Sequence, residues 1–424
     1  MSEKKVVTNQ NDAFENAFDA VPEEKKKSLL SLTFVLAGYP IALSNFVIGG
    51  AVGVGLPFGQ AILALIIGNA VLMSIVIGTG LMAQKTGLST AFLSRRVFGK
   101  NGSSIFSLLL AMSSVTWISL NGDIFSRLIS TTFSWWPIGI PITAIIVIAI
   151  WTQSAIRGYK GLEFISFLGV PAALIMSVAG VVAVARSAGF AGLVDYVPQA
   201  PITMTAATAS IVGGWVFGAT ITPDVCRFAK EKKHVVIAAV AAFSTGCFGL
   251  QFAGALVALA TGYSDFTLAM AALGLSFIAF LAAVFCLWTT QDNNIYGASL
   301  ALQNLFNETK LKGKVTHKQI AIGIAAMAAT FAALGIYNHI LPIISFLSVL
   351  IPPVPGLIIA EEVFVKSPKD NQKTNYIALI AWLVAGVAAQ LSLINNFFVP
   401  PIIGIVVSMV VYTVLSKITN KNSQ

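Results

Sequence analysis

The sequence predicts an all-α integral membrane protein with 12 transmembrane helices arranged as two inverted halves. Of its 424 residues, 56% are hydrophobic and only 10% are charged, whereas about 25% are charged in an average soluble protein. Twelve apolar segments approach the length of about 20 residues that crosses a bilayer. The first and the sixth segments, five apart in order, both carry glycine near their middle, which favours two halves of inverted topology.

The apolar segments also order the chain. A polar tail at residues 1–28 lacks the short apolar core of a cleaved signal peptide. We expect repeats at 29–190 and 200–365, two accessory helices at 376–416 and a second tail at 417–424. The predicted spans are 29–53, 58–83, 103–133, 138–155, 162–185, 203–222, 235–261, 267–306, 319–336, 340–364, 376–393 and 397–416. The eighth is too long for a single span and predicts an extension or a bend.

The positive charges lie on one side of these spans. Of 26 lysine and arginine residues, 24 fall in the tails and in alternate connections; Arg186 falls on the other side and Arg127 inside the third span. The positive-inside rule therefore predicts cytoplasmic termini and a location in the plasma (inner) membrane. Because the net charge of +9 comes from short loops, it does not indicate a nucleic-acid partner.

Breaks in the helices point to a transporter. The first span is interrupted by Gly38 and Pro40, and the sixth contains Gly213 and Gly214. Transporters built from inverted repeats place their site at such paired interruptions, although each glycine alone could simply allow close helix packing. The tenth span contains three prolines within "IPPVPG", which predicts a structural or gating bend.

A polar run, "LWTTQDNNIYG" at 287–297, interrupts the eighth span. Cys286, Thr289 and Thr290 share one helical face. Their carbonyl and hydroxyl oxygens, together with carbonyls freed around Gly38 and Ile41, predict a sodium site. The alternative is that the threonines bond back to their own helix.

Two tryptophans lie near mid-membrane, although tryptophan prefers the interfaces. Trp117 shares a face of the third span with Ser114 and Asn121, and Trp215 directly follows Gly214. Two indoles could hold a flat ring between them; the alternative is ordinary packing.

Further polar residues lie within the spans. The amide of Gln291 can both donate to and accept from the edge of a heterocycle. Asp292 is a functional candidate or half of a pair that joins two helices. Asp123 and Arg127, four residues apart, are predicted to neutralise each other.

Four stretches resemble the nucleobase:cation symporter-1 family, in particular its cytosine permease branch. They are "WTTQDNNIYGASL", "GGWVFGATITPDVCRF", "KTGLSTAFLSRRVFGKNGS" and "FLSVLIPPVPGLIIAE", and the likeness runs over about 32–361. The resemblance implies a LeuT-like fold with ten core helices in two inverted repeats plus two more. It implies sodium ligands from the backbone oxygens of Gly38, Ile41 and Cys286 and the hydroxyls of Thr289 and Thr290. It also implies a substrate stacked between Trp117 and Trp215, with amide contacts from Asn121 and Gln291.

The same resemblance implies a pocket that differs from that of cytosine permeases. Ser114 stands where they carry glutamine, Ala42 where they carry an aromatic residue, Phe217 where they carry serine and Gln291 where they carry asparagine. Substrates in the family include purines, uracil, allantoin, hydantoins and thiamine-precursor pyrimidines. Gly214 and Phe217 are expected to border this pocket.

We therefore expect a secondary active transporter that imports a nucleobase or a related flat heterocycle with sodium. The alternative is a proton-coupled importer of allantoin, a hydantoin or a thiamine-precursor pyrimidine, with Asp123, Asp224 and Asp292 as proton sites. An enzyme is disfavoured, since no H-E-x-x-H motif or phosphate-binding loop is present, and a channel would need no aromatic pair. Beyond sodium we expect no cofactor, and beyond lipid no obligate protein partner.

Overall fold

The computed structural model describes residues 20–157, 159–187, 189–307, 309–311, 314–368 and 371–421. Within these ranges the regular structure is helical, apart from an isolated bridge between Lys27 and Ala229. Residues 1–19 of the predicted N-terminal tail and 422–424 of the predicted C-terminal tail lie outside the described residues. Eight of the described helices are long and apolar enough to cross a membrane, so the chain folds as a multi-span helical membrane protein.

The first half of the chain contains the helices α1 (Leu29–Ala37), α2 (Leu43–Gly55), α3 (Phe58–Thr86), α4 (Thr90–Thr132), α5 (Ile140–Ala155), α6 (Tyr159–Ser187) and the short α7 (Ala191–Val194). The second half contains α8 (Met204–Ile221), α9 (Pro223–Cys226), α10 (Lys232–Phe243), the π-helical turn η2 (Ser244–Gly249), α11 (Leu250–Thr261), α12 (Phe266–Ala272), α13 (Ser276–Asn307) and α14 (His317–Ala333). They are followed by α15 (Ile340–Leu350), α16 (Pro353–Ala360), the π-helical turn η4 (Glu361–Val365), α17 (Tyr376–Ile394) and α18 (Pro400–Lys421).

The first predicted span consists of two helices, α1 and α2, joined by the non-helical residues 38–42. Pro40 has no backbone N–H to continue a helix. The carbonyl of Pro40 instead accepts a hydrogen bond of 2.6 Å from the Asn45 side chain. Residues 38–42 therefore carry carbonyl groups that no helix uses, in the middle of the protein.

The predicted interruption at Gly213 and Gly214 is wrong, because α8 runs through both residues without a break. A Cβ on Gly214 would lie 2.3 Å from the Ile48 side chain of α2, so this glycine allows two helices to pack closely. The helix assignment is interrupted later, at Thr222 between α8 and α9, where the backbone keeps helical torsion angles (φ −58°, ψ −25°). Pro223, the first residue of α9, cannot donate to the preceding turn.

Two long predicted spans are also divided. The eighth consists of α12 and α13, separated by a turn in which Gly274 has a φ of 70°. The tenth consists of α15, α16 and η4, and the first of these gives way to the second at Ile351 and Pro352. Pro352 and Pro353 lie at this change of helix. Neither has a backbone N–H to donate to the preceding turn, which explains the division predicted from the sequence.

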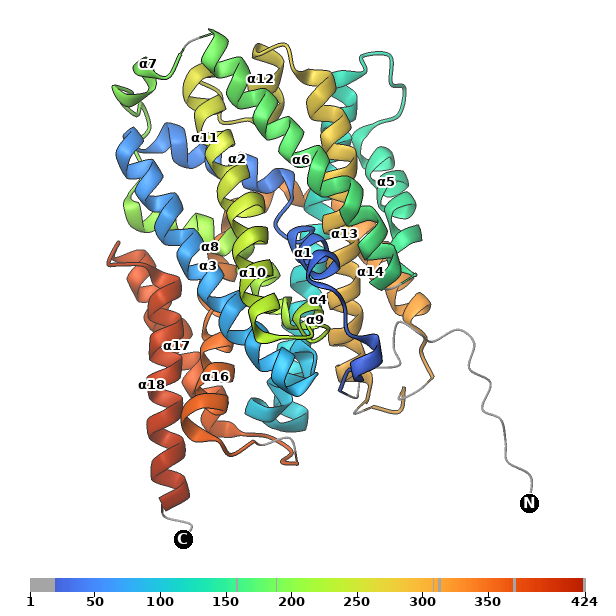
Figure 1. Ribbon diagram of the computed structural model, residues 1–424, viewed down its shortest axis with the longest axis vertical. Coiled ribbons are helices and arrows are strands. Elements are labelled where there is room, and N and C mark those ends of the chain that lie inside the picture. The colour runs from blue at the N-terminus through green and yellow to red at the C-terminus, as the bar shows by residue number, and fades with distance from the viewer. Residues whose placement is uncertain are drawn as a thin grey trace, which may run out of the picture.

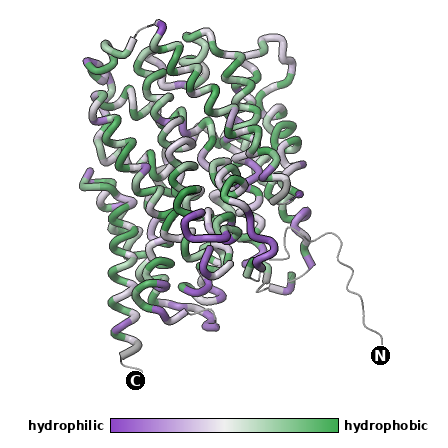
Figure 2. Tube along the Cα trace, in the orientation of Figure 1, coloured by the Kyte–Doolittle hydropathy of each residue, from purple (hydrophilic) through white to green (hydrophobic). Residues whose placement is uncertain are grey.

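Long helices from the two halves meet in the middle of the bundle. The helices α4 and α13 pack along each other, as do α2 with α11 and α3 with α8. In Figure 1, α17 and α18 stand together at one edge beside α16. Figure 2 shows hydrophilic residues gathered towards the end of the bundle at which α18 ends, while the helices above are largely hydrophobic. The site described next lies among α2, α4, α8 and α13.

Candidate substrate and cation site

A small cavity lies where the start of α2 meets α4, α8 and α13. Its volume is about 10 Å³, and its lining residues are Ser44, Trp117, Asn121, Gly214, Trp215, Phe217, Gly218, Thr290 and Asn294. Such a volume accommodates about one water molecule. The walls must therefore separate before a ring of the size of a nucleobase can enter.

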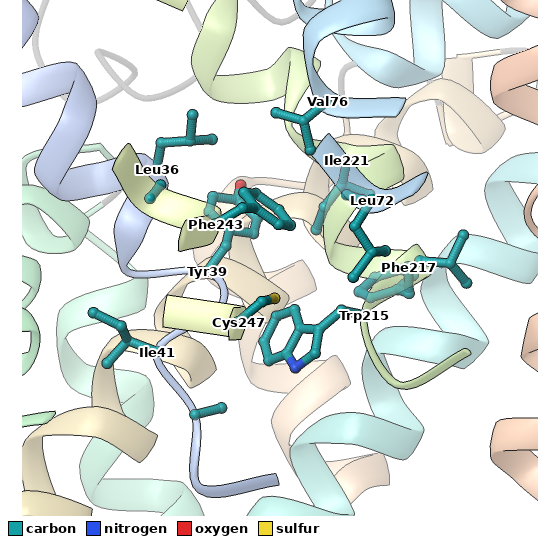
Figure 3. Close-up of a cluster of buried hydrophobic side chains, with 14 of the residues drawn as sticks. Leu36, Tyr39, Ile41, Leu72, Val76, Trp215, Phe217, Ile221, Phe243 and Cys247 are labelled. Carbon is teal, nitrogen blue, oxygen red and sulfur yellow. The ribbon is translucent and has the colours of Figure 1, made fainter. Parts of the chain in front are cut away.

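Both predicted tryptophans border this cavity. Trp117 and Trp215 are 5% and 6% exposed, so neither faces the lipid. The ring of Trp215 lies over Gly218, where a Cβ would be 2.8 Å from a ring carbon. Figure 3 shows the indole nitrogen of Trp215 turned away from the apolar side chains of Leu72 and Phe243. The structure thus brings the two indoles, from helices about a hundred residues apart, to one cavity.

Three polar atoms on the cavity wall have no hydrogen-bond partner within the described part of the chain. Both amide atoms of Asn121 and the indole N–H of Trp215 are buried and unpaired. A buried polar group in this condition costs about 1–3 kcal/mol, so native proteins rarely keep one without a reason. A ligand that offers both a donor and an acceptor would satisfy these atoms.

Two predicted substrate residues, Gln291 and Ser114, do not line the cavity. The Gln291 amide donates to the Ile118 carbonyl of α4 over 3.3 Å, and its own oxygen has no partner. The hydroxyl of Ser114 is likewise buried and unpaired. Asn294 and Ser44 border the cavity in their place. Asn294 follows Thr290 by four residues, so helical periodicity within the polar run could have identified it.

The predicted sodium ligands come together around residues 38–42. The Thr290 hydroxyl lies 2.9 Å from the Ile41 carbonyl and 3.0 Å from the Cys286 carbonyl. A Cβ on Gly38 would lie 2.6 Å from the Thr289 hydroxyl. The oxygen cluster is our name for the Ile41 and Cys286 carbonyls and the Thr289 and Thr290 hydroxyls beside Gly38. The thiol of Cys286 points to the Gly169 carbonyl of α6, so this residue presents its carbonyl, and not its side chain, to the oxygen cluster.

The oxygen cluster is electrically neutral. Its members are backbone carbonyls and hydroxyls, and within the described part of the chain no group of three His, Cys, Asp or Glu side chains could hold a metal ion. Carbonyl and hydroxyl oxygens are ligands for hard cations, and a set without carboxylates suits a monovalent ion. Ser166 of α6, which the sequence analysis did not identify, joins the cluster through a 2.8 Å contact with the Thr289 hydroxyl.

The three membrane aspartates lie outside the cavity wall. Asp123 pairs with Arg127 over 2.5 Å, as predicted. Asp224 accepts a hydrogen bond of 2.8 Å from the backbone N–H of Thr90, at the start of α4. Asp292 accepts a hydrogen bond of 2.8 Å from Ser154 of α5, and its second oxygen has no partner.

A helical membrane bundle with carbonyls exposed by a divided helix, beside a closed and partly polar cavity, is typical of a membrane transporter. The chain matches the family described as "permease for cytosine/purines, uracil, thiamine, allantoin" over residues 20–415, and it belongs to this nucleobase:cation symporter-1 family. The cytosine permease of Escherichia coli (strain K12) is 30% identical over 409 residues, covering 95% of this chain and 94% of the relative.

Solved structures show the same fold. Mhp1, a nucleobase-cation-symport-1 family transporter in a closed conformation with bromovinylhydantoin bound, superposes with a TM-score of 0.76 at 16% identity, covering 95% of this chain and 94% of Mhp1. A Na⁺-coupled sialic acid symporter superposes with a TM-score of 0.67 at 11% identity, covering 93% of this chain and 90% of the symporter. The chain is therefore a multi-pass membrane permease of nucleobase-like substrates.

Proposed function

We propose that the protein imports a nucleobase or a closely related flat heterocycle across the plasma membrane by sodium symport. The observation that carries this proposal is that Thr290 belongs both to the wall of the cavity and to the oxygen cluster. This residue borders the cavity between Trp117 and Trp215. Its hydroxyl also lies between the Ile41 and Cys286 carbonyls of the neutral oxygen cluster.

The proposed substrate is flat because the cavity offers aromatic faces. Trp117 and Trp215 would stack on the two sides of a ring. The unpaired amide of Asn121 supplies one donor and one acceptor for the ring edge. Gln291 and Ser114, whose unpaired oxygens do not line the closed cavity, would reach the substrate when the walls separate. Gly214 and Phe217 complete the pocket.

The proposed coupling ion is sodium. Gly38, Ile41 and Cys286 would contribute carbonyl oxygens, and Thr289 and Thr290 hydroxyl oxygens. Released backbone carbonyls bind sodium in transporters of this architecture. The solved sialic acid symporter with the same fold is Na⁺-coupled, which supports the choice without deciding it.

A proton-coupled importer of allantoin, a hydantoin or a thiamine-precursor pyrimidine is the second candidate. The observation that favours it is Asp292, a buried carboxyl group whose one hydrogen-bond partner in the described structure is the Ser154 hydroxyl. An ionisable side chain inside a membrane protein is a candidate for carrying a proton.

We further propose the LeuT-like arrangement of ten helices in inverted repeats at 29–190 and 200–365, with accessory helices at 376–416. The likeness to Mhp1 and to the sialic acid symporter supports it. Both termini are proposed to be cytoplasmic, because 24 of the 26 lysine and arginine residues lie on their side of the spans.

One uptake experiment tests substrate and ion together. Cells expressing the protein would receive radiolabelled cytosine, uracil, purines, allantoin or hydantoin, in sodium buffer or in choline buffer, with and without a protonophore. We expect uptake of at least one ring compound that disappears in choline. Uptake that is unchanged in choline but lost with the protonophore would contradict sodium coupling and favour the role of Asp292.

A further inference from the structure

The hydroxyl of Ser166 belongs to the oxygen cluster by geometry. Ser166 lies in α6, is fully buried, and approaches the Thr289 hydroxyl to 2.8 Å. A Cβ on Gly38 would lie 2.5 Å from the Ser166 oxygen and 2.6 Å from the Thr289 oxygen. The two hydroxyls therefore cover the same side of Gly38, at the end of α1 where carbonyl groups are free of the helix.

The direction of this hydroxyl is unusual for a serine in a membrane helix. Such serines commonly bond back to a carbonyl of their own helix, and Ser177, also in α6, does so with Ala173 over 2.9 Å. Ser166 instead reaches across to α13. If Ser166 and Thr289 turn their protons to the carbonyls of their own helices, both oxygens can direct lone pairs at a cation.

We propose that Ser166 supplies a sixth oxygen ligand to the cation site and thereby determines which monovalent cation the site prefers. The inference rests on the proposed sodium site and adds a third structural element to it. The cation would then contact residues 38–42, α13 and α6 together. Selectivity among hard cations depends on the number of ligands and the size of the site. Removing one oxygen should therefore weaken sodium binding more than binding of the smaller lithium ion.

This ligand would also connect the cation to the first turn of α1. One turn before Ser166, Glu163 accepts a 2.5 Å hydrogen bond from Ser31 of α1, and its second oxygen lies 3.9 Å from the Lys27 amine. The same helix α6 thus holds α1 at one point and the cation cluster at another. A cation bound through Ser166 would hold α6, α1 and α13 in one arrangement.

The test is cation titration of the purified full-length protein in nanodiscs, followed by intrinsic tryptophan fluorescence and by thermal shift. Sodium and lithium chloride are the probes, with choline chloride to keep ionic strength constant. Ser166→Ala removes the oxygen, and Ser166→Cys keeps a side chain of similar shape but presents soft sulfur, a poor ligand for a hard ion. Ser177→Ala is the matched control, since it removes a buried hydroxyl from the same helix without touching the cluster.

We expect both Ser166 variants to raise the sodium dissociation constant about tenfold or more, with a smaller change for lithium and no change in Ser177→Ala. An unchanged sodium constant in folded Ser166→Ala, with loss of sodium binding in Thr290→Ala, would overturn the role of Ser166 alone. Unchanged sodium binding in Thr290→Ala as well would overturn the sodium site itself. Equal weakening for sodium and lithium would overturn the selectivity part of the proposal.

Discussion

The hydroxyl of Thr290 in α13 lies 2.9 Å from the carbonyl oxygen of Ile41, at the junction of α1 and α2. Thr290 also borders the cavity that contains the two tryptophans. One side chain therefore belongs to both the oxygen cluster and the wall of the substrate cavity. No long path between the two sites is required, because any ligand that orients Thr290 acts on both.

This shared residue predicts reciprocal coupling between ion and substrate. Sodium should tighten substrate binding, and substrate should tighten sodium binding by the same factor, as thermodynamic linkage requires. Thr290→Ala should reduce that factor to near one. The coupling factor is measured by calorimetric titration of each ligand, first without the other ligand and then with the other ligand at a saturating concentration. A factor of one in the unmodified protein would show that the two sites are not linked.

Trp117 is predicted to contribute stacking energy. Trp117→Ala should weaken substrate binding by about 1–3 kcal/mol, the usual range for stacking of a base on an aromatic side chain, whereas Trp117→Phe should keep part of it because a smaller ring still stacks. Equilibrium binding of the radiolabelled substrate distinguishes the two. Trp135→Ala is the control, because Trp135 is 72% exposed and does not line the cavity. Equal binding by Trp117→Ala and the control would refute the sandwich.

Gly218 is predicted to set the position of the Trp215 ring. A Cβ here would lie 2.8 Å from that ring, so Gly218→Ala should displace the indole and weaken substrate binding. Gly323→Ala serves as the control, since Gly323 lies within α14 and a Cβ there meets no atom within 4 Å. Binding constants and thermal unfolding would be measured for both. Loss of binding with retained unfolding temperature is the expected result, and unaltered binding in Gly218→Ala would contradict it.

Asp292 is predicted to join helices, not to carry protons, if sodium is the coupling ion. Asp292→Asn keeps an acceptor for the Ser154 hydroxyl and should retain sodium-dependent uptake. Asp292→Leu removes that acceptor and leaves the Ser154 hydroxyl with the Trp151 carbonyl at 3.1 Å, so the lost hydrogen bond should lower stability by about 0.5–1.5 kcal/mol. Uptake across a range of external pH and thermal unfolding separate these effects. Abolished uptake in a well-folded Asp292→Asn variant would favour proton coupling.

The class and the family of this protein follow from its amino-acid sequence alone. Apolar segments of bilayer length leave few alternatives to membrane helices, because lipid cannot satisfy exposed backbone groups. The polar run at 289–294 marked the site for a related reason, since burying so many polar groups within a span is costly unless they have partners or a function. Local chemistry also explains where the chain leaves the helix, as Pro40 lacks the donor that a helix needs.

Which helix faces meet depends on the packing of the helices in three dimensions. Gly213 and Gly214 look like a break in the sequence, yet α8 continues through both, and Ile48 of α2 occupies the space beside Gly214 that a larger side chain would need. Periodicity places Thr290 and Asn294 on one face of α13 but does not say that this face meets α2 and α4.

The membership of Ser166 in the oxygen cluster shows the same limit. It follows from the packing of α6 against α13, a contact between residues 123 positions apart in the chain. Helical patterns fix the relative direction of side chains within one element. The neighbour that each side chain meets depends on how the elements pack in three dimensions, and that packing is settled by the whole bundle together.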